Sequence, residues 1–159
     1  MQHTPPRQTG RLSAVCIPLI CLAFVFFALS NVLPYAGILQ GVGGILSVAF
    51  LFLTIRFSLS SYRYEIDADS LFVYCRQGKR EEALCSISLS SILALYTKKT
   101  YKENSPSPAL RYNFCQNLGA KDAVYLLFVF DDVIDKRAVI SFEPSEEMLT
   151  FLKQYEREV

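Results

Sequence analysis

The chain is 159 residues long, which is room for one ordinary domain and a smaller segment beside it. Its formal net charge is +1, so no overall positive field points to a nucleic-acid partner. The hydrophobic content of 52% is high for a soluble protein, and the two halves of the chain contribute to it in different ways.

An uncharged run of 44 residues separates Arg11 from Arg56. The turn-forming stretch SNVLPY divides this run into two apolar segments. At about 1.5 Å per helical residue, each segment approaches the roughly 30 Å thickness of a bilayer core. We therefore predict a hairpin of two transmembrane helices, at about residues 12–30 and 36–55.

The first apolar segment also has features of a secretory signal. Arg7 and Arg11 precede it, and Ala28–Ser30 resembles a cleavage site. Its apolar run is, however, longer than the roughly 7–15 residues of a signal, and bulky residues (Phe24–Phe27) lie close to the supposed cut. A retained helix and a cleaved signal are both open alternatives, and neither alters the domain that follows.

The orientation follows from positive charges near the membrane, which favour the cytoplasmic side. Arg7 and Arg11 precede the first helix, Arg56 and Arg63 follow the second, and the loop between the helices carries no charge. We predict a multi-pass protein of the cell membrane with both termini in the cytoplasm. The five cysteines, an odd number without paired spacing, fit a reducing compartment.

Small residues recur along the second predicted helix, at Gly37, Gly41 and Gly44. Spacings of four and three place them on one helix face, where another helix can approach closely. Two partners are open for this helix-packing face. It packs either against the first helix of the same hairpin or against another copy or another membrane protein.

From Phe57 onward the sequence changes to short alternating runs rich in Tyr, Val, Ile and Phe, which are typical of strands. A helix follows, because the apolar residues from Met148 to Val159 recur at helical spacing, and Ser145 is placed as its N-cap. Seven strands are predicted, at about residues 62–66, 71–76, 82–88, 94–101, 111–115, 124–130 and 137–142.

This order of elements, together with the stretches YRYEIDADSLFVYCRQGKREEALCSISLSSI and YLLFVFDDVIDKRAVISFEPSEEMLTFL, resembles the pleckstrin-homology-like (PH-like) domains of bacteria over about residues 60–155. The preceding hairpin resembles that of the family's membrane-attached members. The resemblance implies an α+β fold, a seven-stranded antiparallel β-sandwich or barrel capped by a C-terminal helix. The expected domains are a cytoplasmic tail (1–11), the transmembrane hairpin (12–55) and a cytoplasmic PH-like domain (60–159).

No catalytic constellation is recognisable in the sequence. The one histidine, His3, lies in a tail that we expect to be disordered, so Ser/His or Cys/His catalysis lacks a base. The cysteines have no CxxC spacing for zinc, and the glycines form no phosphate-binding loop. Asp131, Asp132 and Asp135 are interpreted as a solvated turn. We predict a protein that is not an enzyme and has no cofactor and no metal.

Basic residues are the remaining candidates for a site. PH domains that bind phosphoinositides carry a basic first hairpin, whereas the corresponding turn here, Asp67–Ser70, is acidic, so phosphoinositide binding is not expected. The other basic residues are either solvated or contact anionic headgroups. The candidates for membrane-surface or partner contacts are Lys79, Arg80, Lys98, Lys99 and Lys102.

We expect a non-catalytic binding or scaffold module that docks a protein partner at the membrane, through the loop Lys102–Ala109 and adjoining strands. The alternative is an accessory subunit of a transporter or envelope complex that acts through its transmembrane hairpin.

Overall fold

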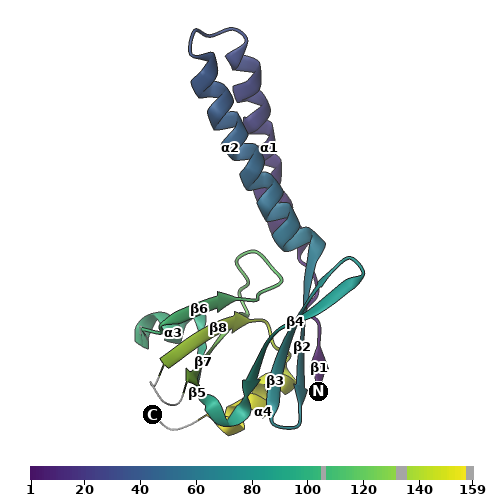
Figure 1. The fold of residues 1–159 in the computed structure, drawn as a ribbon, viewed down its shortest axis with the longest axis vertical. Helices are drawn as coiled ribbons and strands as arrows, with labels where there is room; N and C mark the ends of the chain where they lie inside the picture. Colours follow the sequence, from purple (N-terminus) through teal and green to yellow (C-terminus); the bar gives the residue numbers. More distant parts are fainter. Residues whose placement is uncertain (105–106, 132–135, 157–159) are drawn as a thin grey trace. The chain divides into compact units, whose positions relative to one another are not determined.

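The computed structural model describes residues 1–104, 107–131 and 136–156. The chain forms two compact units. Gln8–Ser60 form the first, called here the hairpin unit, and Met1–Arg7 together with Ser61–Val159 form the second, the sheet unit. The chain therefore begins in the sheet unit, leaves it to form the hairpin unit, and then returns to it (Figure 1).

The hairpin unit consists of α1 (Thr9–Ser30) and α2 (Ala36–Thr54), and a π-helical turn, η1 (Ile55–Leu59), prolongs the second helix. Both helices are long and apolar enough to cross a membrane, as predicted. Most of their large apolar side chains are exposed in the unit itself, which suits helices surrounded by lipid rather than by a protein core.

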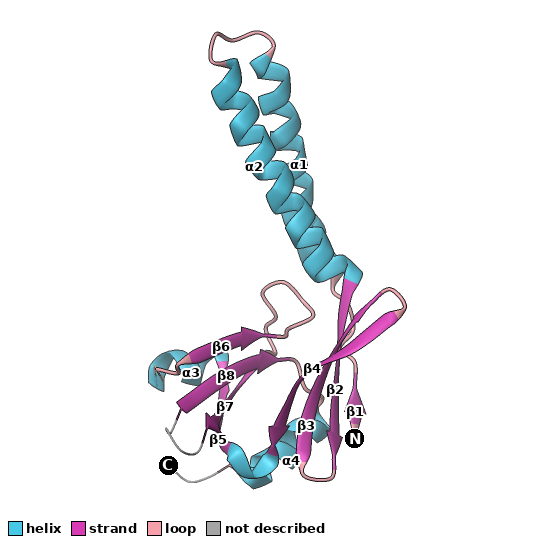
Figure 2. Ribbon diagram, in the orientation of Figure 1, coloured by secondary structure: helices cyan, strands magenta, loops and turns pink. Residues whose placement is uncertain are grey.

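The sheet unit contains two four-stranded sheets in the part of the chain that is described (Figure 2). Sheet A has the order β1-β2-β3-β4, and sheet B has the order β5-β7-β8-β6. The strands of sheet A are β1 (Gln2–His3), β2 (Ser60–Asp67), β3 (Ser70–Gln77) and β4 (Arg80–Ser88). Those of sheet B are β5 (Ile92–Thr97), β6 (Leu110–Asn113), β7 (Val124–Asp131) and β8 (Lys136–Phe142).

Alternation along the strands builds the core. In β2 the buried positions alternate with half-buried ones, and Tyr62, Tyr64 and Ile66 all point inward. They pack in one cluster with apolar residues of β3, β4, β5, β7 and β8. The turn after β2 places Ala68 at φ 45°, and the turn after β3 uses Gly78 at φ 62°, a conformation that glycine adopts without strain.

A short helix, α4 (Glu146–Leu152), closes this core, and a 3-10 turn, η3 (Lys153–Tyr155), prolongs it. Ser145 is the N-cap, as predicted, because its Oγ accepts a hydrogen bond from Met148 N at 3.2 Å. Met148 and Leu152 are fully buried in the main core. A 3-10 turn, η2 (Leu89–Ser91), connects sheet A to sheet B.

Three expectations about the sheets were wrong. The described residues form eight strands instead of seven, because His3 and Gln2 of the supposedly disordered tail pair antiparallel with β2 as strand β1. Strand β6 runs parallel to β8, so the unit is not wholly antiparallel. The two sheets do not join into a closed barrel within the described residues, since β4 and β6 each end a sheet.

The predicted strand over residues 94–101 was also wrong at its end. It stops at Thr97, and Lys98–Asn104 form the helix α3. Thr100 N donates to Thr97 Oγ1 at 3.3 Å, while Thr97 N donates to Thr100 Oγ1 at 2.9 Å. This reciprocal pair caps the first turn in the manner of a capping box and so starts a helix where the apolar pattern favoured a strand.

Candidate binding groove

An apolar groove lies in the sheet unit where the last strand of sheet A and the last strand of sheet B leave a gap. Its volume is about 240 Å³. One wall comes from β4 and the other from β6, with residues of β7 and β8 lining the rest. The lining residues are Leu84, Cys85, Ser86, Ile87, Leu110, Tyr112, Phe114, Phe128, Phe130, Ala138 and Ile140.

Four large apolar side chains of this lining are more than a third exposed. They are Leu84 (45%), Leu110 (37%), Tyr112 (47%) and Phe130 (53%). Such a contiguous apolar surface at a concave site favours binding, whereas apolar side chains scattered singly over a surface do not.

A bulge in β4 supplies one of these side chains. Val73 pairs with Cys85 and Tyr74 pairs with Ala83, so Leu84 is left between two ladder positions. A bulge of this kind bends the strand and turns the extra side chain away from its regular direction. Leu84 consequently lines both the groove and a second hollow of similar volume, which Cys75, Gln77, Arg80 and Glu82 complete.

Each wall also offers the outer edge of a sheet. Strand β4 is the last strand of sheet A and β6 is the last strand of sheet B, so neither edge faces a further strand of the described chain. The main-chain donors and acceptors of such an edge pair readily with an added extended segment. Aromatic rings stiffen the wall at β6, because Tyr112 and Phe114 stack with centroids 6.0 Å apart and planes 2° apart.

Cys85, which lines the groove, is expected to be unreactive at neutral pH. Burial raises the pKa of the Cys85 thiol from its ordinary value of 9.0 to about 11, although a hydrogen bond to the Val73 main chain partly opposes the shift. At neutral pH the thiol therefore stays protonated, and a protonated thiol is a poor nucleophile and a poor metal ligand.

A buried polar network holds the loop between β6 and β7. Asn117 N donates to Glu143 Oε1 at 2.8 Å, and Asn117 Nδ2 donates to Glu143 Oε2 at 2.7 Å and to Pro6 O at 3.0 Å. Tyr64 Oη donates to Phe114 O at 2.9 Å and accepts from Glu143 N at 3.3 Å. Burial raises the pKa of the Tyr64 phenol far above its ordinary value, which keeps it a neutral donor.

The candidate basic residues fall in two separate places. Lys79 and Arg80 are exposed at the turn between β3 and β4, whereas Lys98, Lys99 and Lys102 are exposed on α3. Figure 1 draws α3 beside sheet B and well apart from that turn. The structure therefore does not gather these five side chains into one site.

The predicted helix-packing face of Gly37, Gly41 and Gly44 does not contact the first helix of the hairpin. A Cβ atom at Gly37, Gly41 or Gly44 would meet no atom within 4 Å, so none of the three packs against α1. The close approach occurs at Gly43, where a Cβ atom would lie 3.2 Å from the Phe27 ring. Sequence reasoning missed Gly43 because the three outward glycines have the more regular spacing.

Where the structure describes them, the predicted acidic turns bring no metal ligands together. Asp67 and Asp69 form the exposed turn between β2 and β3, as expected. Asp131 ends β7, while Asp132 and Asp135 lie outside the described residues. Among the residues described, no group of three His, Cys, Asp or Glu side chains could hold a metal ion.

The sole histidine, His3, belongs to strand β1. Its ring stacks on Tyr64 with centroids 6.4 Å apart. The histidine therefore packs on the sheet unit, outside the groove lining.

Comparison of the chain with protein-family models, with curated proteins and with solved structures gives no match.

Proposed function

We propose that this protein is a membrane-anchored, non-catalytic binding module whose groove between β4 and β6 holds an extended segment of a partner protein. The observation that carries the proposal is the combination of an apolar lining with two sheet edges that face no further strand of the described chain. Main-chain pairing to an edge supplies affinity, and apolar pockets for alternate side chains supply selectivity. A cavity of about 150 Å³ can hold a benzene ring, so the 240 Å³ of the groove suits one or two apolar side chains.

The two apolar helices support the membrane anchor. Strand β1 comes before α1 and pairs with β2, which comes after α2. One folded unit thus holds both ends of the hairpin, so helices that each cross the bilayer must begin and end on one side of it. The arginines that flank the helices favour the cytoplasmic side. A retained α1 is part of the proposal, and its support is the pairing of β1, which cleavage after Ser30 would remove from its sheet.

A PH-like arrangement is part of this proposal. Its support is the sequence resemblance together with two packed sheets and a C-terminal helix that closes the core. The groove would then lie at the gap between the last strands of the two sheets, and β6 adjoins the loop that the sequence suggested as a binding surface.

Site-specific photo-crosslinking tests the groove. A photoreactive phenylalanine analogue at Leu84 or Tyr112 should capture a partner in intact membranes, and one at Phe72, which stacks on Tyr74 away from the groove lining, serves as the matched control. Mass spectrometry of the adduct should identify an extended segment with apolar side chains. The introduction of Leu84→Glu should abolish capture at Tyr112.

Equal capture at Phe72 and Tyr112, or capture that survives Leu84→Glu, would contradict the groove proposal. For the anchor, the intact mass of the purified protein should equal that of the whole chain. A mass that lacks the first 30 residues would show α1 to be a cleaved signal.

A second function has one observation in its favour. Gly37, Gly41 and Gly44 leave an open face on α2, which suits an accessory subunit of a transporter or envelope complex that binds through its hairpin. Gly41→Leu should then remove a co-purifying membrane protein. Under the groove proposal the same substitution leaves the captured partner unchanged.

A further inference from the structure

Three segments of the sheet unit meet where the chain leaves it at Arg7 and returns at Ser61, which we call the exit end. Ser61 Oγ donates to Arg76 O at 3.5 Å, which places the turn between β3 and β4 beside the start of β2. On the other side, Asn117 Nδ2 donates to Pro6 O at 3.0 Å. The loop between β6 and β7 therefore lies beside the N-terminal segment.

Positive charge gathers at the exit end. One of its basic residues, Arg63, forms an ion pair with Glu81, with 3.0 Å between Nε and Oε1. Glu65, which lies 3.7 Å from Arg63, is a further carboxylate of these segments, as are Glu82 and Asp122, so six basic residues stand against four acidic ones. The exposed basic residues of the exit end are Arg7, Arg76, Lys79, Arg80 and Lys121.

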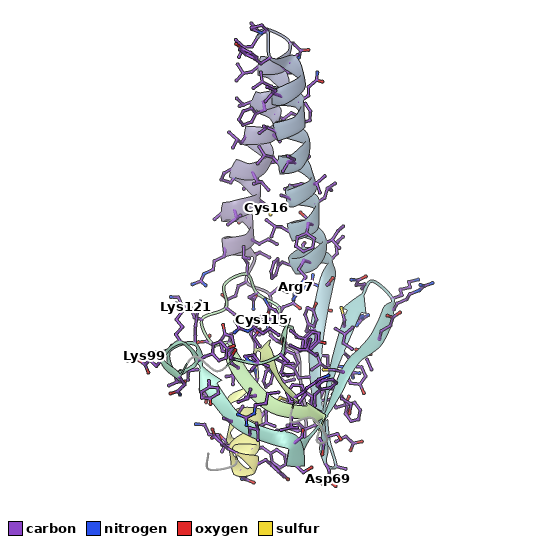
Figure 3. All side chains as sticks on the ribbon, turned by 60° about the vertical axis from the view of Figure 1, so that its left-hand side comes forward. Arg7, Cys16, Asp69, Lys99, Cys115 and Lys121 are labelled. Atoms are coloured by element: carbon purple, nitrogen blue, oxygen red, sulfur yellow. The ribbon has the colours of Figure 1, made fainter. Side chains whose placement is uncertain are left out.

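The turn at the opposite end of sheet A is acidic. This turn, between β2 and β3, exposes Asp67 and Asp69. Figure 3 labels Arg7 and Lys121 at one end of the sheet unit and Asp69 at the other. The two exposed turns of sheet A therefore differ in charge, since the turn at Lys79 and Arg80 is basic and the turn at Asp67 and Asp69 is acidic.

Chain length ties the exit end to the apolar helices. Two peptide steps join Arg7 to the first residue of α1, Thr9, a span of at most about 7 Å. On the return, η1 ends at Leu59 and β2 begins at the next residue. If the helices cross a bilayer, these short connections hold the exit end close to its surface.

We propose that the exit end is a docking surface for the anionic headgroups of the bilayer that holds the hairpin unit. This inference rests on the membrane anchor of the proposed function. Guanidinium and ammonium groups donate charge-assisted hydrogen bonds to phosphate oxygens. Each cation near an anionic leaflet favours contact with it by about fivefold. Headgroup binding orients the sheet unit, with the acidic turn at Asp67 away from the membrane.

Helix α3 provides a matched control for charge. Lys98 and Lys99 are exposed, like Lys79 and Arg80, and they are also neighbours in sequence. Their helix lacks a short connection to the hairpin, and Lys99 lies 4.0 Å from Glu103. Removing two charges there changes the net charge equally without altering the exit end.

Hydrogen exchange of the full-length protein in nanodiscs tests the docking surface. One set of discs contains phosphatidylcholine alone, and the other contains phosphatidylcholine with phosphatidylglycerol. Peptides covering residues 76–82 should exchange about fivefold more slowly with phosphatidylglycerol present. About 1 M salt, at which the screening length falls to about 3 Å, should abolish the difference. The double variant Lys79→Gln/Arg80→Gln should lose the protection, and Lys98→Gln/Lys99→Gln should keep it.

Equal exchange in the two lipid mixtures would overturn the docking surface, as would equal losses in the two double variants. Protection that appears only with an added acidic protein would assign the surface to that protein instead. Co-flotation with vesicles distinguishes the underlying proposals. A chain that floats with vesicles but shows no lipid-dependent protection retains its anchor and lacks the surface, whereas a chain that does not float lacks the anchor itself.

Discussion

The side-chain amide of Asn117 donates to the main-chain oxygen of Pro6 at 3.0 Å, although 111 residues of sequence separate them. The same amide group donates to the Glu143 carboxylate at 2.7 Å. One buried side chain thus fastens the N-terminal segment to the loop after β6 and to the end of β8. The bond matters because, in the sequence, the whole apolar hairpin separates Pro6 from the rest of the sheet unit.

Asn117→Leu should destabilise the sheet unit. The substitution removes one buried hydrogen bond, to the Glu143 carboxylate, which is only 8% exposed, and one part-buried hydrogen bond, to Pro6 O. The expected loss is about 2–3 kcal/mol. Urea denaturation in detergent, followed by tyrosine fluorescence, measures it. Asn104→Leu on the exposed face of α3 should change the midpoint little, and an equal loss there would contradict the role of Asn117.

The pairing of β1 can be tested with proline. Met1 O accepts from Ile66 N at 2.7 Å, and antiparallel ladders alternate, so the His3 N–H should point at β2 and the Gln2 N–H away from it. His3→Pro should therefore destabilise the sheet unit by about 1–3 kcal/mol, because proline removes that donor.

Two control variants accompany His3→Pro in the same denaturation assay. Gln2→Pro keeps the ladder and should cost much less. His3→Ala measures what the ring contact with Tyr64 contributes on its own. Equal destabilisation by the two prolines would show that β1 does not pair in this register.

Alkylation should report the environment of Cys85. Because burial raises the pKa of this thiol to about 11, its thiolate fraction at pH 8 should be about a hundredfold below that of the unfolded chain. The iodoacetamide rate in the folded protein should keep rising until about pH 11, whereas in urea it should level off near pH 9. Quantitative mass spectrometry of the Cys85 peptide measures both rates. A folded-state rate that levels off near pH 9 would show that the thiol is not buried.

Gly43→Leu should weaken the contact between α1 and α2. A side chain at this position meets the Phe27 ring at 3.2 Å, and an overfilled contact costs about 1–3 kcal/mol. Thermal loss of the helical circular dichroism signal in detergent measures the effect. Gly41→Leu, whose Cβ atom has open space, should leave the melting temperature unchanged. A lower melting temperature for Gly41→Leu alone would reverse the two assignments.

Local patterns in the sequence were sufficient to predict much of this fold. Alternation places Tyr62 and Tyr64 on one face of β2, although only the structure shows that this face is the core. The apolar run predicts the two helices to within about a turn at each end. Ser145 marks the start of α4 because an N-cap needs a side-chain acceptor at one defined position. Each of these signals depends on neighbours in sequence.

The features that could not be predicted depend on partners distant in sequence. Gln2 and His3 form a strand too short to show any periodicity, and their pairing exists because β2 returns beside them. Strand β6 joins β8 in parallel, an order that no local pattern encodes. The groove is a consequence of that order, since it lies between the strands that end the two sheets. Even the start of α3 depends on a reciprocal bond between Thr97 and Thr100, which the β-favouring residues around it obscure.

The placement of β1 before the hairpin has a consequence for biosynthesis. A ribosome releases Gln2 and His3 long before their partners Glu65 and Tyr64, and the entire apolar hairpin is translated in between. Sheet A therefore cannot be completed until both helices have been made. For a chain inserted in a bilayer, a first helix integrated in the wrong orientation would leave β1 on the side of the membrane opposite to β2. Completion of the sheet unit would then itself distinguish a correctly integrated chain from a wrongly integrated one.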